Sequence, residues 1–205
     1  MTTIIVGSGN PAKVNEVKRY LCDLPVVFTA KSDSDLGITI DETAETFEGN
    51  VRAKLEGFSS ATKLPVMAAD GGMEIPALNN WPGVRTRRMG SDERKTDDEM
   101  VAILQEKINA LPEDKRQFCI VDVWGFMVPG SKPILARGEL EGVLLAEPDA
   151  RYEPGFPLRK FWWIPKFNKH FYDLTESEHD EVNHHKQALD RLRPAIEEYL
   201  EVNHA

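Results

Sequence analysis

The chain has 205 residues, of which 41% are hydrophobic, so it can bury the core of one sizeable domain and is not expected to be disordered. Its net charge of −9 argues against a nucleic-acid polymer or an anionic membrane surface as the main partner. A small phosphorylated ligand remains compatible with this charge, because it needs only a local basic pocket. No apolar run approaches the length of a membrane span.

Two features favour a cytoplasmic protein. Cys22 and Cys119 are isolated and lack CxxC spacing, which is typical of reduced thiols. The N-terminus leads directly into a predicted strand, with no signal peptide before it.

The first predicted strand, 3–6, is a β-branched run followed by a glycine-rich turn and a helix. Pro11 suits the first turn of that helix, and Ser8 or Asn10 can cap it. Such a helix start favours anion binding, because backbone N–H groups and the helix dipole point to one spot, and Lys13 would add a full charge. The alternative is an ordinary strand–helix unit with a solvated lysine. The spacing of a Walker loop or of GxGxxG is absent.

The next segments predict a second strand at 26–30, an extended piece at 36–40 and a strong helix at 46–62. Thr46 is a candidate N-cap for this helix. Lys54 lies on the apolar stripe of the helix. It either snorkels to water at the edge of the stripe or points inward to meet an anion.

A short apolar strand at 66–69 is predicted to end at Asp70, which two glycines follow. A carboxylate at the C-terminal end of a strand is a common position for chemistry in α/β proteins. The alternative is an Asp-Gly turn, which is frequent. Residues 85–88 add a basic cluster that is either solvated or meets phosphate.

The remaining segments complete a single domain, residues 1–205. We expect helices at 97–110, 176–182 and 183–202, strands at 118–128, 134–145 and 161–165, and a loop at 147–159. The first two of these strands are expected to form an antiparallel hairpin, with a break near Gly138 or Gly142. The predicted fold class is therefore α/β, with a mixed sheet flanked by helices.

Five motifs, in order over most of the chain, resemble those of the inosine/xanthosine triphosphate pyrophosphatases, a family that acts on non-standard purine nucleoside triphosphates. The family motifs are [ST]xNxxK, an acidic segment before TFxxNAxxKA, [DE]D[ST]GL, PGxxSxR and SHRxxAL. Their counterparts here are residues 8–13, Glu42 with 46–55, 69–73, 82–88 and 183–189. Each motif alone is weak, but their order and spacing together are specific.

The resemblance implies a Mg²⁺-dependent hydrolase that converts a nucleoside triphosphate to the monophosphate and pyrophosphate. It also implies an elongated mixed sheet, two lobes with a central cleft, and a homodimer. By this resemblance Asp70 and Lys13 are catalytic, with Asp70 as the base, and Glu42 and Asp70 bind the metal. The implied substrate-binding residues are Ser8, Asn10, Lys13, Lys54, Gly71, Phe156, His184 and His185.

The chemical properties of these residue types agree with these roles. A triphosphate needs cations and N–H donors, which the first turn, Lys13 and Lys54 can supply. Mg²⁺ is usually held by one or two carboxylates together with substrate phosphates, for which Glu42 and Asp70 are candidates.

Two departures from the family pattern fall near the phosphate and metal residues. Ala69 stands where the family has the first acid of a DD or ED pair, and Gly71 stands where it has Ser or Thr. A nucleotide-binding protein with a weak or inactive site is therefore an alternative to an active enzyme. Pyrophosphate release from a panel of triphosphates separates the two.

Three further departures fall where the family recognises the base. Residues 155–161 lack the Tyr/Trp-Asp pair of the family's GFGYDP loop, and His185 replaces the arginine of SHR. The family's lysine ahead of that motif aligns near His179. We therefore expect an altered base preference, unless a neighbouring residue such as Arg159 restores the usual chemistry. A metal site built from the histidines is disfavoured, because no HExxH or Cys/His ligand set accompanies them.

Overall fold

The structure is a computed structural model that describes residues 2–204 and divides into two compact units. The first unit contains the chain up to Asp70, the segment Asp122–Gly138, and the chain from His184 onward. The second unit contains Gly71–Val121 and Glu139–Asn183. Among the described residues, no helix combines the length and the apolar character needed to cross a membrane.

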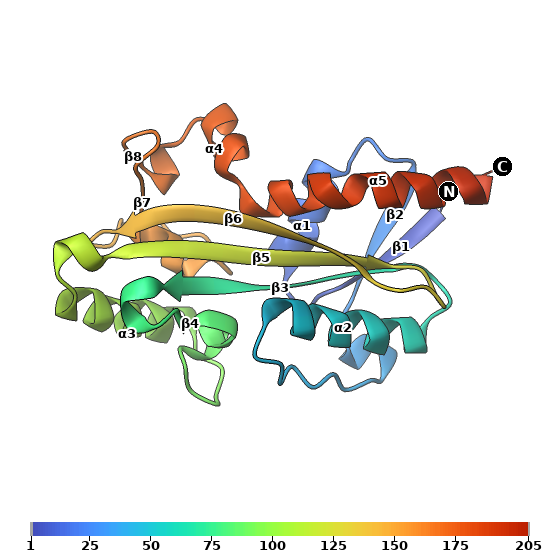
Figure 1. Cartoon of the computed structure of the whole chain (residues 1–205), viewed down its shortest axis with the longest axis horizontal. Coiled ribbons are helices and arrows are strands. Elements are labelled where there is room, and N and C mark those ends of the chain that lie inside the picture. The colour runs from blue at the N-terminus through green and yellow to red at the C-terminus, as the bar shows by residue number, and fades with distance from the viewer. Residues whose placement is uncertain (1, 205) are drawn as a thin grey trace. The chain divides into compact units, whose positions relative to one another are not determined.

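The described strands form an eight-stranded sheet in the order β2-β1-β3-β5-β6-β7-β8, and β4 pairs with β3 (Figure 1). The strands are β1 (Thr2–Gly7), β2 (Val26–Lys31), β3 (Val66–Ile75), β4 (Trp81–Pro82), β5 (Gln117–Met127), β6 (Ile134–Leu144), β7 (Trp162–Ile164) and β8 (Lys169–His170). The pairs β1–β2 and β1–β3 are parallel, whereas β6–β7 and β7–β8 are antiparallel. The prediction of a mixed sheet flanked by helices is confirmed.

The helices form where the apolar spacing and the capping residues predict them. They are α1 (Pro11–Tyr20), α2 (Phe47–Ala61), α3 (Asp97–Ala110), α4 (Glu176–Val182) and α5 (His184–His204). The side chain of Thr46 caps α2 by accepting from the Gly49 amide. Capping boxes begin α3 at Thr96 and α4 at Thr175, where a threonine and a glutamate three residues later satisfy each other's backbone amides.

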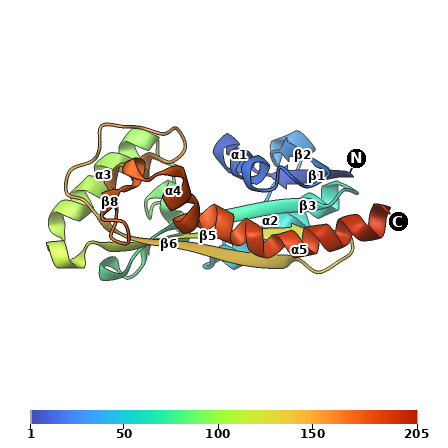
Figure 2. The ribbon, with the colours of Figure 1, turned by 90° about the horizontal axis from the view of Figure 1, so that it is seen from above.

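In the first unit, helices cover both faces of the strands. Trp124 and Phe126 of β5 belong to the core cluster that contains residues of α1 and α5. Gly125, which points the other way, lies against Val51 and Leu55 of α2. One face of these strands therefore carries α1 and α5, and the other carries α2 (Figure 1). Seen from above, α5 runs toward the C-terminus alongside this part of the sheet (Figure 2).

The second unit has its own core, built from its strands, α3 and the segment before β7. Phe118, Trp162 and Phe171 form tilted and edge-on aromatic contacts in this core. Leu104 and Ile108 of α3 are completely buried there. The apolar face of α3 is thus buried in this core, as the amphipathic spacing of the helix predicts.

Two of the predicted segments differ from the structure in their bounds. The extended piece predicted at 36–40 is placed too early, because Leu36 belongs to a short 3-10 helix over Ser34–Leu36 and Gly37 lies in the left-handed region. β3 continues through Asp70 as far as Ile75 instead of ending there. A side chain at Gly72 would clash with Thr86 and Gly83, so this glycine permits close packing of an extended strand rather than a turn.

The predicted break in β6 is also absent, because the strand runs unbroken from Ile134 to Leu144. The backbone of His184 packs directly against Gly138, and the carbonyl group of Trp163 packs against Gly142. Each glycine therefore admits a neighbouring backbone rather than ending the strand. The predicted loop 147–159 is confirmed as far as residue 156, and its end is wrong because a 3-10 helix covers Pro157–Phe161.

Candidate active site

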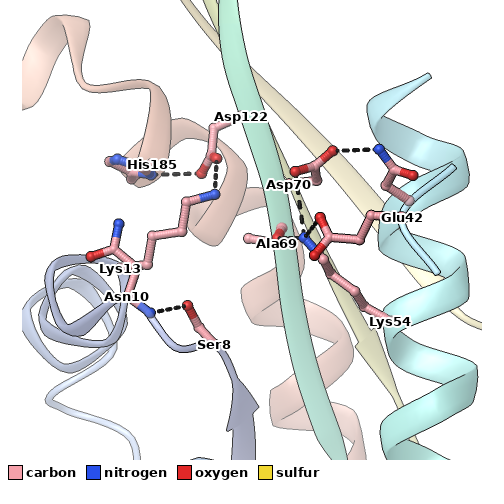
Figure 3. A network of polar contacts seen from close by, with 10 residues as sticks. Ser8, Asn10, Lys13, Glu42, Lys54, Ala69, Asp70, Asp122 and His185 are labelled. Atoms are coloured by element: carbon pink, nitrogen blue, oxygen red, sulfur yellow. Dashed lines mark hydrogen bonds and ion pairs between the residues drawn. The ribbon is translucent and has the colours of Figure 1, made fainter. Parts of the chain in front are cut away.

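The turn between β1 and α1 has the predicted form of a capped helix start. The Asn10 side chain accepts a hydrogen bond from the Ala12 amide at 3.0 Å, and Pro11 occupies the first helical position. Ser8 Oγ accepts from the Asn10 amide at 3.1 Å, which fixes the turn one step earlier. Lys13 follows in the first turn of α1 and points away from the helix axis (Figure 3).

Lys13 reaches a carboxylate that the sequence analysis did not include. Its Nζ lies 3.0 Å from Oδ1 of Asp122 on β5. The other carboxylate oxygen of Asp122 lies 2.6 Å from Nδ1 of His185, in the first turn of α5 (Figure 3). Three elements that are distant in sequence therefore meet at one buried carboxylate.

A second polar cluster surrounds Lys54 of α2. Its Nζ lies 2.7 Å from Oε2 of Glu42, 3.4 Å from Oδ1 of Asp70 and 3.2 Å from the carbonyl oxygen of Ala69. Asn50, one helical turn earlier, donates to Oδ2 of Asp70 at 2.9 Å. Lys54 therefore points inward, as one of the two alternatives from the sequence predicts, and the snorkelling alternative is wrong.

The two clusters lie on opposite faces of β3, because successive side chains of a strand alternate. Ala69 packs in the core with residues of α1 and α5, whereas Asp70 faces Asn50 and Lys54 of α2. Figure 3 shows β3 passing between the Lys13 cluster and the Asp70 cluster. Position 70 is thus a carboxylate set within a strand, with a helix beside it.

The charges of one cluster influence a pKa in the other. Burial lowers the pKa of Lys13, but the carboxylates of Asp122, Asp70 and Glu42 outweigh burial and raise that pKa above its ordinary value. Burial alone would raise the pKa of Asp122, yet Lys13 and His185 hold it well below the usual range. The Lys13–Asp122 pair is therefore ionised throughout the neutral range, and Nδ1 of His185 donates to a carboxylate.

Counted over both clusters, two lysines are paired with three carboxylates, and Lys13 is also influenced by the charges of Asp70 and Glu42. These five side chains together carry a net negative charge. A divalent cation and a polyanion can enter such a group together, because the cation meets the carboxylates and the polyanion meets the lysines.

Eight of the predicted site residues lie in the first unit. They are Ser8, Asn10, Lys13, Glu42, Lys54, Asp70, His184 and His185. Both histidines are almost completely buried, at 3% and 2% exposure. Their rings lie against each other at a tilt of 39° with centroids 4.2 Å apart, so they are packed side chains at the start of α5 and not surface groups.

Gly71 and Phe156 belong to the second unit. The guanidinium of Arg159 lies 3.7 Å from the centre of the Phe156 ring and is paired with Glu153 at 2.6 Å. Phe161, at the end of the same segment, is completely buried in the core. Phe156 is therefore the aromatic side chain of residues 155–161 that keeps partial exposure.

Sequence reasoning missed Asp122, and it assigned no role to Asn50 although this residue lies within the motif at 46–55. Asp122 stands between Val121 and Val123 in a strand of apolar residues, and this isolated acid was a signal that could have been noticed. Asn50 lies four residues before Lys54, on the same face of α2, so helical spacing could have placed it near the same partner.

The geometry defines an α/β protein with a lysine- and carboxylate-lined site built around a capped helix start. The comparisons agree with this class. A family model described as the Ham1 family matches residues 4–195. A dITP/XTP pyrophosphatase from Synechocystis is 30% identical over 193 residues, which is 94% of each chain.

Solved structures give the same result. A HAM1 protein from Coxiella burnetii has a TM-score of 0.80 at 28% identity, over 97% of this chain and 100% of that one. The Staphylococcus aureus Ham1 protein has a TM-score of 0.78 at 26% identity, again over 97% and 100% of the two chains. This chain belongs to the Ham1 family.

Proposed function

We propose that this protein hydrolyses a nucleoside triphosphate to the nucleoside monophosphate and pyrophosphate. Water attacks the α-phosphorus, the bond from that phosphorus to the oxygen bridging it to the β-phosphate breaks, and a proton of the water passes to a base. The observation that carries the proposal is the convergence of Glu42 and Asp70 on the Lys54 ammonium group in a member of the Ham1 family.

The carboxylates of this cluster fit a magnesium ion. Three oxygens, from Glu42, Asp70 and the carbonyl group of Ala69, already surround one cation, the Lys54 ammonium group. Mg²⁺ takes oxygen ligands and commonly uses one or two carboxylates with substrate phosphates, so Glu42 and Asp70 would hold it. Such an ion supplies charge neutralisation at the phosphates and polarisation of water. The described residues contain no group of three or more His, Cys, Asp or Glu side chains suited to a metal.

Asp70 is our candidate for the base. Asn50 donates to one carboxylate oxygen of Asp70 at 2.9 Å. Because the carboxylate is planar and rigid, this hydrogen bond also sets the direction of the other oxygen. Lys54 lies on the side of that second oxygen. A carboxylate oriented in this way is suited to accept a proton at a set position.

Lys13 and Lys54 are proposed to contact the phosphates. Replacing either lysine by Ala should lower kcat/KM about 10- to 100-fold, because a hydrogen bond to a charged group contributes roughly 1.5–3 kcal/mol. The loss should be the same for every base, as measured by pyrophosphate release. Lys18→Ala is the matched control, since Lys18 is an exposed lysine on the same helix. A loss confined to one base would contradict the phosphate role.

We also propose a base preference different from that of inosine- and xanthosine-specific enzymes. His185 stands where the family pattern has an arginine, and its Nδ1 is engaged with Asp122. A neutral imidazole can donate or accept, whereas an arginine can only donate. Gly71, Phe156, His184 and His185 are each proposed to bind the substrate, and Ser8 and Asn10 to shape the phosphate turn.

A substrate panel tests this function. Pyrophosphate release with Mg²⁺ is measured for inosine, xanthosine and the standard nucleoside triphosphates. We expect turnover of at least one of them, without a clear preference for the first two. A clear preference for inosine and xanthosine triphosphates would refute the altered specificity alone. Binding of triphosphates without any turnover would instead indicate a nucleotide-binding protein.

A homodimer is proposed from the family resemblance. Of the four tryptophans, Trp81 and Trp163 keep partial exposure, and aromatic side chains of this kind are enriched at interfaces. Light scattering at micromolar concentration should give twice the mass of one chain. A mass equal to one chain would exclude the dimer.

A cytoplasmic location is also proposed. Cys22 and Cys119 form no disulfide, which fits a reducing compartment. Fractionation of the source cells, with the protein followed by antibody, tests this.

A further inference from the structure

Asp122 lies on the face of the sheet that Ala69 shares. Ala69 of β3 and Trp124 and Phe126 of β5 belong to one core cluster, which also contains residues of α1 and α5. Side chains two residues apart on a strand point the same way, so Asp122 faces the same side as Trp124. β3 and β5 are neighbours in the sheet. The carboxylate missing at position 69 therefore has a counterpart on the adjacent strand.

The surroundings of Asp122 show that its buried charge depends on its partners. Its side chain is 2% exposed and its chain neighbours Val121 and Val123 are completely buried. A charge in such a position is strongly unfavourable unless it is paired and hydrogen-bonded. Lys13 and His185 provide that pairing at 3.0 and 2.6 Å.

Lys13 needs Asp122 in turn. A positive charge in the first turn of a helix is opposed by the helix dipole. The Lys13 side chain is only 17% exposed, so water alone does not solvate it. A carboxylate aimed at its ammonium group from β5 offsets both effects and fixes where the group lies.

We propose that Asp122 is a positioning residue for the hydrolysis: it supplies from β5 the carboxylate that Ala69 lacks on β3, and it holds the Lys13 ammonium group at the phosphate-binding start of α1. This inference rests on the proposed function, because it concerns how Lys13 is presented to phosphates. Asp122 itself touches no reacting atom and acts through Lys13.

The same arrangement accounts for His185. An arginine at this position would bring a second permanent charge to the carboxylate that Lys13 uses. An imidazole ring donates one N–H to Asp122 without the permanent charge of a guanidinium, while the Lys13 ammonium group is bonded to the other oxygen of the same carboxylate. The identities of Ala69, Asp122 and His185 are therefore mutually compatible: the carboxylate is on β5, and an imidazole is bonded to it.

Relocating the carboxylate tests the proposal. Asp122→Val should lower kcat/KM at least tenfold for every triphosphate, since Lys13 loses its anchor. The double variant Ala69→Asp with Asp122→Val returns a carboxylate to the same face and should recover most of that loss. Asp190→Asn, which breaks an exposed pair with Lys186 on α5, is the control for a lost carboxylate and should leave kcat/KM unchanged.

A second variant keeps the test decisive where Asp122→Val does not fold. Asp122→Asn preserves the shape of the side chain and removes its charge. We expect a loss of kcat/KM together with an upfield shift of the His185 Nδ1 proton in the NMR spectrum, because that proton no longer faces a carboxylate. A role confined to stabilising the fold would lower Tm and leave kcat/KM of the folded protein unchanged.

The outcomes separate this inference from the proposed function. Unchanged kcat/KM in folded Asp122→Asn, or a folded double variant no more active than Asp122→Val, would overturn the positioning role while the function stands. A wild-type protein that releases no pyrophosphate from any triphosphate would overturn the function and, with it, this inference.

Discussion

Replacement of Asp70 by Asn is expected to lower kcat by at least about 100-fold, since a positioned general base contributes roughly 10²- to 10⁴-fold. The oxygen of an asparagine side chain can still accept from Asn50, so the contact between β3 and α2 is kept. The lost charge removes both the proton acceptor and one of the two carboxylates near Lys54. Pyrophosphate release measures the turnover, and calorimetric titration with Mg²⁺ and a triphosphate measures the accompanying loss of affinity.

The matched control for this change is Asp92→Asn. Asp92 is a carboxylate with 93% of its side chain exposed, so the substitution alters the net charge equally without touching a buried group. Its kcat should equal that of the wild type. If Asp70→Asn keeps most of the wild-type turnover, Asp70 is not the base.

Gly138→Ala is expected to damage the site from a distance. A Cβ at this position would overlap the carbonyl oxygen of His184 and lie 2.8 Å from its carbonyl carbon. The atoms that it would meet belong to the backbone and cannot rotate away as a side chain could, so either β6 or the first turn of α5 must move. We expect a destabilisation of about 1–3 kcal/mol, with a fall in Tm of roughly 2–4 °C for each kcal/mol. A fall in kcat/KM should follow, because His185 moves with its helix.

Gly142→Ala separates these two effects. It lies on the same strand and would bring a Cβ within 2.6 Å of the carbonyl oxygen of Trp163, so a comparable loss of stability is expected. Its neighbours are not those of α5, and kcat/KM measured well below Tm should stay near the wild-type value. Equal activity losses in the two variants would show that the position of α5 is not what Gly138 protects.

Local signals were sufficient for the helices and most strands. The threonine cap and the apolar stripe of α2 lie within one segment, and the structure places that helix within a residue of the predicted range. Glycine in β3 and β6 was misinterpreted because its role is set by contacts outside the segment. Gly72 is extended against Thr86, and Gly138 receives the backbone of His184, contacts that no local pattern contains.

The candidate site was likewise predictable where its signals are local in sequence, and not where they depend on distant residues. The turn at Ser8 and Asn10 carries its own capping signal, and Lys54 was open to two interpretations until Glu42 and Asp70 were seen beside it. Asp122 depends on partners 109 residues before it and 63 residues after it. Only the folded chain brings them together, so a lone acid in an apolar strand could be noticed but not interpreted.

The late position of His185 in the chain has a consequence for biosynthesis. Synthesis runs from the N-terminus, so Lys13 and Asp122 exist well before the ribosome reaches α5. Until that helix docks, the buried carboxylate has lost one of its two partners, and the apolar surface that Leu189, Leu192 and Ile196 cover is exposed. A nascent or truncated chain that lacks α5 therefore lacks His185 beside Asp122, and the proposed site is complete only after this helix has been made and has docked.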